Sequence, residues 1–291
     1  MKIIVRLRGG LGNQFFQYAV GRSLSDLHNG ELLLDDSLLG RTSSGISPRH
    51  YGLEMYRIQA RRLRNEERLN LQFRVLRPFR YLYALGLLKS SFIYYQEPHF
   101  EFDPNVFQLK GNVILSGFWQ SHRYFTNIED KVRQELKPIH TPPTEVSRLM
   151  NQIAKTNSVS LHIRRGDYVS CQKALDLFYI CDATYYRRAV NMIAERVINP
   201  TFFIFSDDPD PISKSLQIGF PTVIVSRPQL SAHDDLRLMS HCNHHIIANS
   251  TFSWWGAWKN PDPNRIVVAP SRWFLIPTNT QDLIPNGWHT V

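Results

Sequence analysis

The sequence predicts an α/β protein made of two Rossmann-like halves. From residue 158 onward, short apolar strands alternate with helices, which is the pattern of a parallel, doubly wound sheet. The first half repeats this plan more loosely, opening with a strand, a glycine turn and a helix. A chain of 291 residues is also long for a single hydrophobic core, so we expect two domains of ordinary size.

A proline-rich break separates the two halves. The stretch from Lys137 to Pro143 contains Pro138, Pro142 and Pro143, and the regular alternation begins after it. We place the domain boundary at this break or shortly after it, which gives an N-terminal domain of residues 1–150 and a C-terminal domain of residues 151–291.

The first half begins with a strand and then a glycine turn, Gly9 to Gln14. Such a turn brings backbone N–H groups and a helix N-terminus toward a bound anion. The pattern is weak as a phosphate motif, because Phe15 stands where the dinucleotide fingerprint has its third glycine, and a tight structural turn fits it equally well. The expected elements of this half are strands over residues 2–8, 31–34 and 112–119 and helices over residues 15–27 and 121–136.

The second half has the more regular pattern. Its expected elements are strands over residues 158–163, 201–206, 222–225, 244–248 and 265–268, with helices over residues 183–197, 212–217, 232–241 and 252–258. In an open sheet of this kind, ligands bind at the carboxyl ends of the strands. Three of these ends carry polar residues, and we expect them to converge on one site.

The densest charge follows the strand that ends at Ile163. Because side chains alternate along a strand, His162 and Arg164 leave one face while Leu161 and Ile163 leave the other. Arg164 and Arg165 suit a phosphate or diphosphate through forked, charge-assisted hydrogen bonds. The competing interpretation is a local surface pair between Asp167 and one of the arginines.

Two further strand ends add hydroxyls and carboxylates. Asp207, after the strand over residues 201–206, can accept hydrogen bonds from a base or ribose, or it can cap the next helix. Ser250 and Thr251 stand at the start of a helix and form a second candidate anion cradle. Asp208-Pro209-Asp210 matches a loose Asp-x-Asp metal motif, but turns of this composition are common, and we expect no metal.

Composition narrows the class of protein. Hydrophobic residues make up 43% of the chain and charged residues 20%, as in ordinary globular proteins. Three cysteines without a Cys-x-x-Cys pair argue against a disulfide framework. His241, His244 and His245 lie beside a single cysteine and favour structural roles over zinc. The N-terminal apolar run is too short for a signal peptide and no stretch is long enough to span a bilayer, so we expect a cytoplasmic protein.

Positive charge is concentrated in a basic segment, residues 57–89. It holds nine basic residues against Glu66 and Glu67, a net +7 of the chain's +9. Interleaved leucines and phenylalanines would let this segment lie on an anionic membrane face, although a solvated helical face fits equally well. No zinc finger, helix-turn-helix or aromatic RNA-binding signature accompanies the charge, so nucleic acid is not the expected partner.

The motifs together resemble glycosyltransferase family 11, the GDP-fucose-dependent α-1,2-fucosyltransferases. The resemblance rests on Gly9 to Gln14, His162 to Tyr168, Ser206 to Asp208 and Ala248 to Trp258, with support from Gly117-Phe118-Trp119-Gln120. It implies a GT-B architecture, in which two Rossmann-like domains face across a cleft and the C-terminal one holds most of the GDP. It also implies inverting, metal-independent transfer of L-fucose from GDP-β-L-fucose to the 2-hydroxyl of a terminal β-galactose.

The resemblance further implies the setting of the reaction. Soluble bacterial members commonly build surface polysaccharides such as lipopolysaccharide O-antigen. The N-terminal domain would then bind the galactoside acceptor, which can be a lipid-linked glycan, and the enzyme would work in the cytoplasm or on the inner membrane surface. No cofactor is expected beyond the GDP-fucose donor.

The resemblance also implies roles for individual residues. Arg164, together with Arg165, would compensate the charge on the departing β-phosphate, and His162 would hold the nucleotide or orient an arginine. Asp207 would contact guanosine. Asp167 is the nearest candidate by motif for the base that removes the acceptor hydroxyl proton. The neighbouring arginines should lower its pKa, in which case it would only orient them, and Asp35 and Asp36 are more distant candidates. The remaining donor-binding residues would be Gly10, Gly12, Asn13, Gln14, Asn249, Ser250, Thr251 and Phe252.

Two other functions stay open at this point. Related families with similar motifs make α-1,6 linkages or fucosylate proteins, so the linkage can differ. A non-catalytic GDP-sugar-binding or membrane-associated protein would instead use the basic segment as its working surface.

Overall fold

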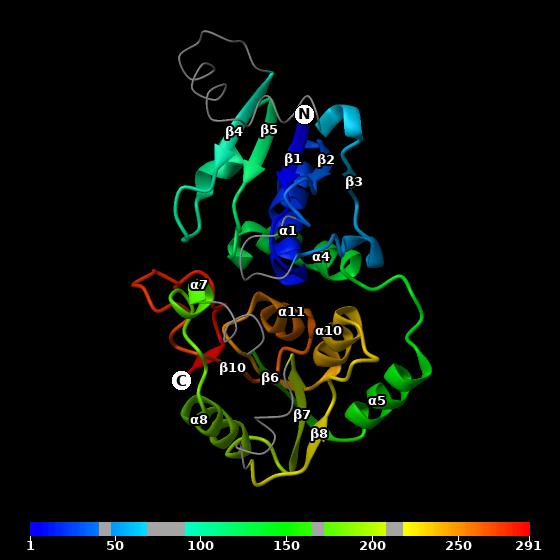
Figure 1. The fold of residues 1–291 in the computed structure, drawn as a ribbon, viewed down its shortest axis with the longest axis vertical. Helices are drawn as coiled ribbons and strands as arrows, with labels where there is room; N and C mark the ends of the chain where they lie inside the picture. The colour runs from blue at the N-terminus through cyan, green and yellow to red at the C-terminus, as the bar shows by residue number, and fades with distance from the viewer. Residues whose placement is uncertain (41–47, 69–90, 165–171, 208–217) are drawn as a thin grey trace. The chain divides into compact units, whose positions relative to one another are not determined.

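The structure, a computed structural model, describes residues 1–40, 48–68, 91–164, 172–207 and 218–291 (Figure 1). It divides into two compact units. Of the described residues, those up to Lys137, together with Asn279–Leu283, form unit 1, whereas Pro138–Thr278 and Ile284–Val291 form unit 2. Each unit folds around its own parallel sheet. The two Rossmann-like halves expected from the sequence are therefore present.

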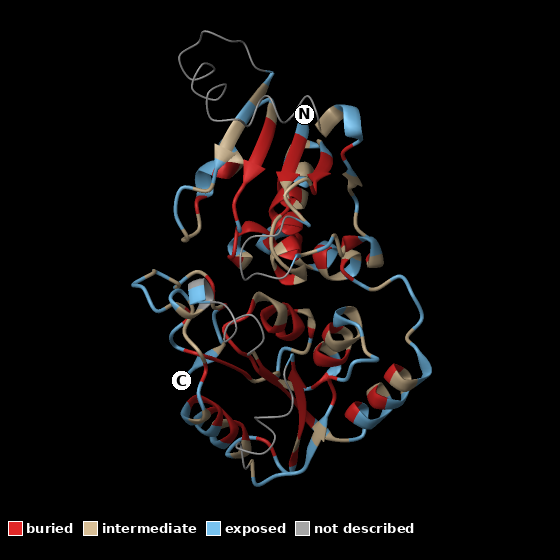
Figure 2. Ribbon diagram, viewed as in Figure 1, coloured by how far each residue is buried: buried red, intermediate tan, exposed pale blue. Residues whose placement is uncertain are grey.

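Unit 1 contains a five-stranded sheet in the order β3-β2-β1-β5-β4, and all of its strand pairs are parallel. Its strands are β1 (Lys2–Arg6), β2 (Glu31–Asp35), β3 (Arg61–Arg62), β4 (Phe92–Gln96) and β5 (Asn112–Ser116). Its helices are α1 (Leu11–His28) and α4 (Glu129–Glu135), with 3-10 turns η1 (Leu53–Met55), η2 (Pro104–Gln108), η3 (His122–Tyr124) and η4 (Thr126–Ile128). The central strands β1 and β5 are apolar and buried, which fits strands covered on both faces (Figure 2).

Helix α1 starts earlier than the sequence predicts. Gly9 has φ 77°, a left-handed conformation that favours glycine, and Gly10 is the N-cap. The helix then begins at Leu11, so Gly12, Asn13 and Gln14 lie in its first turn and not in a loop. The glycine turn is thus one tight bend followed at once by helix.

The prediction of a single helix over residues 121–136 is wrong. The chain forms η3, η4 and the short α4 there. Ser121 caps η3 by accepting a hydrogen bond from the Arg123 N–H at 3.3 Å. Phe125 then leaves helical geometry, with φ −137°, and its buried ring lies 6.3 Å from that of Phe16 on α1. Packing against α1 has overridden local helix propensity.

Unit 2 contains a six-stranded parallel sheet in the order β11-β10-β9-β6-β7-β8. Its strands are β6 (Asn157–Ile163), β7 (Pro200–Ser206), β8 (Thr222–Ile224), β9 (His244–Ile246), β10 (Val267–Ala269) and β11 (His289–Thr290). Its helices are α5 (Thr144–Ala154), α7 (Gln172–Leu175), α8 (Ala183–Ala194), α10 (Ala232–His241) and α11 (Thr251–Lys259). The helix expected over residues 212–217 lies outside the described residues.

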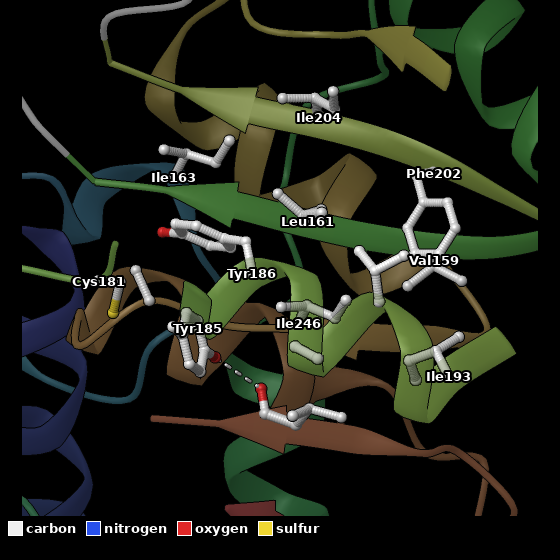
Figure 3. Packing of buried hydrophobic residues seen from close by; sticks show 14 of the residues in the cluster. Val159, Leu161, Ile163, Cys181, Tyr185, Tyr186, Ile193, Phe202, Ile204 and Ile246 are labelled. Atoms are coloured by element: carbon white, nitrogen blue, oxygen red, sulfur yellow. Dashed lines mark hydrogen bonds between the residues drawn. The ribbon is translucent and has the colours of Figure 1, made fainter. Parts of the chain in front are cut away.

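The two faces of this sheet carry different layers. On one face, Val159, Leu161 and Ile163 of β6 pack against Tyr186 and Ile193 of α8 (Figure 3). On the other face, alternate residues of β7 pack against α5 and α10. Because β6 places its apolar residues toward α8, its polar residues, including His162, belong to the opposite face. The predicted period of two along this strand is confirmed.

The division between the units lies at Lys137 and not at residue 150. Helix α5, which spans the expected boundary, belongs to unit 2 because Val146, Leu149 and Ile153 are buried in the core with α10 and β7. The proline-rich break itself is therefore the junction. The predicted cleft between the domains stays a prediction.

No helix within the described ranges is long and apolar enough to cross a membrane.

Candidate active site

The carboxyl edge of the unit 2 sheet brings Arg164 and Asp207 together. Strands β6 and β7 are parallel and in register, with Ile163 opposite Ser206, so the next residue on each chain is also adjacent. Arg164 Nη1 lies 2.6 Å from Asp207 Oδ2, and the side chains are 21% and 26% exposed. This charge-assisted contact holds one end of the guanidinium in place at the surface of the sheet edge.

His162 precedes this ion pair and is almost fully buried, with 5% of its surface exposed. Burial lowers its pKa to about 3, assisted by the positive charge of Arg164 and opposed by Asp207. The imidazole is therefore neutral at pH 7. Among the described residues its Nδ1 has no hydrogen-bond partner, and its ring centroid lies 5.9 Å from that of Phe252. A neutral imidazole with an unbonded ring nitrogen can donate to or accept from a ligand.

Helix α11 begins beside this histidine. Ser250 is its N-cap, and the Ser250 hydroxyl accepts a hydrogen bond from the Phe252 N–H at 3.3 Å. Strand β9, which leads to this helix, pairs with β6 at Leu161 and Ile246. The structure thus places Ser250, Thr251 and Phe252 on the same sheet edge as His162, as the sequence predicts.

Asn249 has a structural use in this arrangement. Its side-chain amide is buried and donates to the backbone carbonyls of Tyr179 and Trp273, the latter at 3.0 Å. Its side-chain oxygen accepts from the Cys181 thiol at 3.7 Å. The side chain therefore joins two surrounding segments to the end of β9. Its predicted part in donor binding stays a prediction.

A network that the sequence analysis missed supports the end of β7. The Ser226 hydroxyl accepts from the Ser206 N–H at 3.1 Å and donates to Asp235 Oδ2 at 2.8 Å. Burial raises the pKa of Asp235 to about 6. The sequence holds one signal for this network. Asp234 alone completes the capping box of α10, so the adjacent Asp235 is free to take another role.

The glycine-turn residues of unit 1 divide into two kinds. Gln14 is buried, and its amide donates to the carbonyls of Gly9 at 3.2 Å and His50 at 2.8 Å while accepting from the Gly52 N–H at 3.1 Å. It therefore ties the turn to a neighbouring loop. Asn13 remains partly exposed and accepts one hydrogen bond, from Gln120 Nε2 at 2.8 Å.

The two outside candidates for the base are ion-paired. Asp35 lies 3.3 Å from Arg6, and Asp36 contacts both Arg62 and Arg68. These carboxylates therefore balance arginines at the end of β1, in β3 and shortly after β3. Arg165, Asp167 and Asp208, which the sequence analysis also singled out, lie outside the described residues.

The described part of the basic segment, residues 57–68, is largely neutralised by neighbours. Arg61 contacts Glu31 at 3.0 Å and Glu67 at 2.8 Å. Arg62 and Arg68 both contact Asp36. This pairing favours the solvated-face interpretation for that part. Contact with an anionic membrane stays a prediction.

The clustered histidines have structural roles, as expected. His245 is fully buried between the Ser160 hydroxyl at 2.8 Å and Asn260 Nδ2 at 3.1 Å. His244 Nδ1 accepts from the Ile266 N–H at 3.0 Å, and His241 Nδ1 lies 2.8 Å from the Arg237 carbonyl. Each ring nitrogen named here is bonded to another group of unit 2.

The family model for glycosyl transferase family 11 matches residues 93–290. The chain belongs to this family. An Escherichia coli α-1,2-colitosyltransferase is 35% identical over 98% of this chain and 97% of that protein. The O-antigen biosynthesis glycosyltransferase WbnK, also from Escherichia coli, is 32% identical over 97% of this chain and 98% of its own length.

A solved structure shares this fold. The structure of an Arabidopsis thaliana FUT1 mutant in complex with GDP aligns with a TM-score of 0.54 at 12% identity, covering 91% of this chain and 69% of that one. The two parallel sheets and their helices give a mixed α/β, GT-B-like fold. The family and fold predicted from the motifs are thus confirmed.

Proposed function

We propose that this family 11 glycosyltransferase moves L-fucose from GDP-β-L-fucose to the 2-hydroxyl of a terminal β-galactose, with inversion and without a metal. The observation that carries the proposal is the Arg164–Asp207 ion pair at the carboxyl edge of the unit 2 sheet, beside the buried neutral His162. A guanidinium held at a sheet edge suits a diphosphate leaving group.

Arg164 is the main electrostatic group in this proposal. Departure of GDP leaves negative charge on the β-phosphate, and a guanidinium already oriented by Asp207 stabilises that charge without reorganising. Arg165 would add a second positive charge. Asp207 would contact guanosine and, in addition, orient Arg164.

The other nucleotide contacts follow from the same edge of the sheet. His162, neutral and with Nδ1 unbonded among the described residues, would hydrogen-bond the nucleotide. Ser250 and Thr251, at the start of α11, would bind phosphate oxygens with the help of the helix N-terminus. Asn249 and Phe252 would complete this cradle.

Unit 1 would supply the acceptor side. Gly10, Gly12 and Asn13 would reach toward the diphosphate and fucose, with Gln14 holding the turn that presents them. Asp167 is our proposed base for the acceptor hydroxyl proton. The product would be part of a surface polysaccharide such as an O-antigen, a setting supported by the name of the WbnK relative.

A second donor is supported by one specific observation. The relative that is 35% identical over nearly the whole chain is named an α-1,2-colitosyltransferase. Colitose lacks one hydroxyl that fucose carries, so a site that hydrogen-bonds this hydroxyl would reject colitose strongly, whereas a site that leaves it unbonded would accept both sugars. The α-1,2 linkage is common to both versions of the proposal.

Parallel assays with the two donors test both versions of the proposal. GDP-fucose and GDP-colitose are each supplied with a panel of β-galactosides, with EDTA in parallel tubes, and the new linkage is assigned by NMR. We expect fucose on the galactose 2-hydroxyl, at a rate that EDTA does not change. Preference for GDP-colitose would replace the donor, a different linkage would contradict the acceptor position, and nucleotide binding without turnover would favour a non-catalytic protein.

A further inference from the structure

Glu97 follows β4 at the carboxyl edge of the unit 1 sheet. Both of its carboxylate oxygens accept backbone N–H groups, from Phe118 at 2.6 Å and from Trp119 at 2.8 Å. These residues belong to the segment Gly117–Gln120, which follows β5, the strand next to β4. Hydrogen bonds from backbone N–H groups to a carboxylate are strong, so Glu97 sets the course of this segment.

The segment has a conformation that requires such support. Trp119 has φ 58°, which is unfavourable for a bulky residue, and its ring is fully buried. Gly117 is equally constrained, because a Cβ there would lie 2.5 Å from the Cβ of Glu97. Gln17 of α1 adds a hydrogen bond from Nε2 to the Gly117 carbonyl at 3.2 Å. The bend at residues 117–119 therefore depends on the Glu97 side chain for its hydrogen bonds and on Gly117 for the space that this side chain occupies.

The consequence of this bend lies at its last residue. Gln120 is buried, and its Nε2 donates to Asn13 Oδ1 at 2.8 Å, joining positions that are 107 residues apart in the sequence. An amide whose oxygen is bound in this way has its NH₂ group pointed in one direction. Gly9 leaves room for that group, since a Cβ at Gly9 would lie 2.3 Å from Asn13 Nδ2.

We propose that Glu97 is a positioning residue, which acts through the backbone of residues 117–120 and the side chain of Gln120 to orient Asn13. The inference rests on the proposed function, in which Asn13 faces the diphosphate and fucose. Glu97 does not touch the reacting groups in this scheme. It determines where the Asn13 amide donates, and a displaced donor weakens transition-state binding.

A double-mutant cycle tests the kinetic part. Gln120→Ala and Glu97→Gln are each expected to lower kcat about tenfold, because small misplacements of a positioned group cost one to two orders of magnitude. Asn13→Ala should lower it at least as much. If Gln120 acts only through Asn13, the Gln120→Ala/Asn13→Ala variant is no slower than Asn13→Ala alone. Effects that multiply in the double variant would overturn the proposal.

Amide NMR of the same variants tests the positioning without relying on activity. Glu97→Gln should move the backbone amide signals of Phe118 and Trp119 upfield, since a neutral acceptor replaces a carboxylate, and should shift the Asn13 side-chain NH₂ signals. Glu101→Gln, a partly exposed carboxylate in the same loop, is the matched control and should leave all of them in place.

The two readouts separate the possible failures. Shifted Asn13 signals with no fucosyl transfer by the unaltered protein would contradict the proposed function while supporting the positioning. Unmoved Asn13 signals in both Glu97→Gln and Gln120→Ala would overturn the positioning, whatever the activity of the enzyme.

Discussion

The carboxyl edges of the two parallel sheets are built alike but are used differently. In unit 1, the amides of Gln14 and Gln120 and the carboxylate of Glu97 are all bonded to other parts of the same unit. In unit 2, the edge carries an ion pair, Arg164–Asp207, and a buried histidine whose Nδ1 has no partner among the described residues. The unit 1 edge also carries an ion pair, Arg6–Asp35, so the difference lies in the buried, neutral histidine that stands beside the ion pair of unit 2.

This difference teaches how a repeated βα plan can divide the work of a transferase. Backbone turns and satisfied amides hold a surface in one shape, which is useful for orienting a neutral sugar. A partly exposed guanidinium with a buried neutral imidazole provides the electrostatics that a leaving diphosphate requires. The following changes should act on one edge and spare the other.

Arg164→Ala should have the largest effect. In the proposed function the guanidinium stabilises the leaving group, so we expect kcat/KM to fall about 10³-fold, or about 4 kcal/mol of transition-state stabilisation. Arg187→Ala, on the exposed face of α8, is the matched control and should retain full activity. A folded Arg164→Ala protein that keeps substantial activity would refute the assignment.

Asp235→Asn should change the pH dependence of stability. The folded pKa of Asp235, about 6, lies above its unfolded value, so the carboxyl stabilises the fold below about pH 4 and that contribution is lost as the pH rises through 6. Relative to the variant, the unaltered protein should lose up to about 3 kcal/mol of unfolding free energy between pH 4 and 7. Urea unfolding across this range measures it.

Parallel stability profiles for Asp235→Asn and the unaltered protein would contradict that prediction. Asp130→Asn, which removes an exposed carboxylate from the first turn of α4, is the comparison that should leave the profile unchanged.

Gln14→Ala should separate scaffold from site within the glycine turn. The substitution leaves the His50 carbonyl and the Gly52 N–H without their buried partner, and we expect the free energy of unfolding to fall by about 2 kcal/mol. Asn13→Ala leaves one donor, Nε2 of the buried Gln120, without its partner, so it should cost about 1 kcal/mol, less than Gln14→Ala, while affecting activity more. The reverse order in thermal denaturation would show that Asn13 is the structural residue.

Arg61→Ala should have the smallest effect. Its contacts with Glu31 and Glu67 are exposed, and exposed ion pairs contribute less than about 1 kcal/mol. The Arg61 hydrogen bonds hold the pKa of Glu67 at about 2, so NMR titration of the variant should show that pKa rising toward its usual range. A larger loss of stability would mean that the basic segment supports the fold of unit 1.

Much of the fold was predictable because unit 2 follows simple rules. The alternation along β6, the strand at β7 and the helices α8 and α10 follow from apolar periodicity, whereas α11 follows from an apolar run that is buried throughout from Ser253 to Trp258. Prediction failed where packing overrides local preference, as at η3, η4 and α4, and where short strands such as β3 gain their pairing only from a neighbour. The domain boundary was placed too late because α5 was not recognised as part of the second core.

The sequence by itself determined the family, the α/β class and the chemical types of the site. Motifs such as His162 to Tyr168 combine residue types with a strand period, and both are local properties of the chain. Only the tertiary structure decided which groups meet. The register of β6 with β7 joins Arg164 to Asp207, and a bend held by Glu97 brings Gln120 to Asn13. Contacts between distant residues depend on how strands pair and on which backbone N–H groups need partners. Neither can be predicted from the sequence of a single segment.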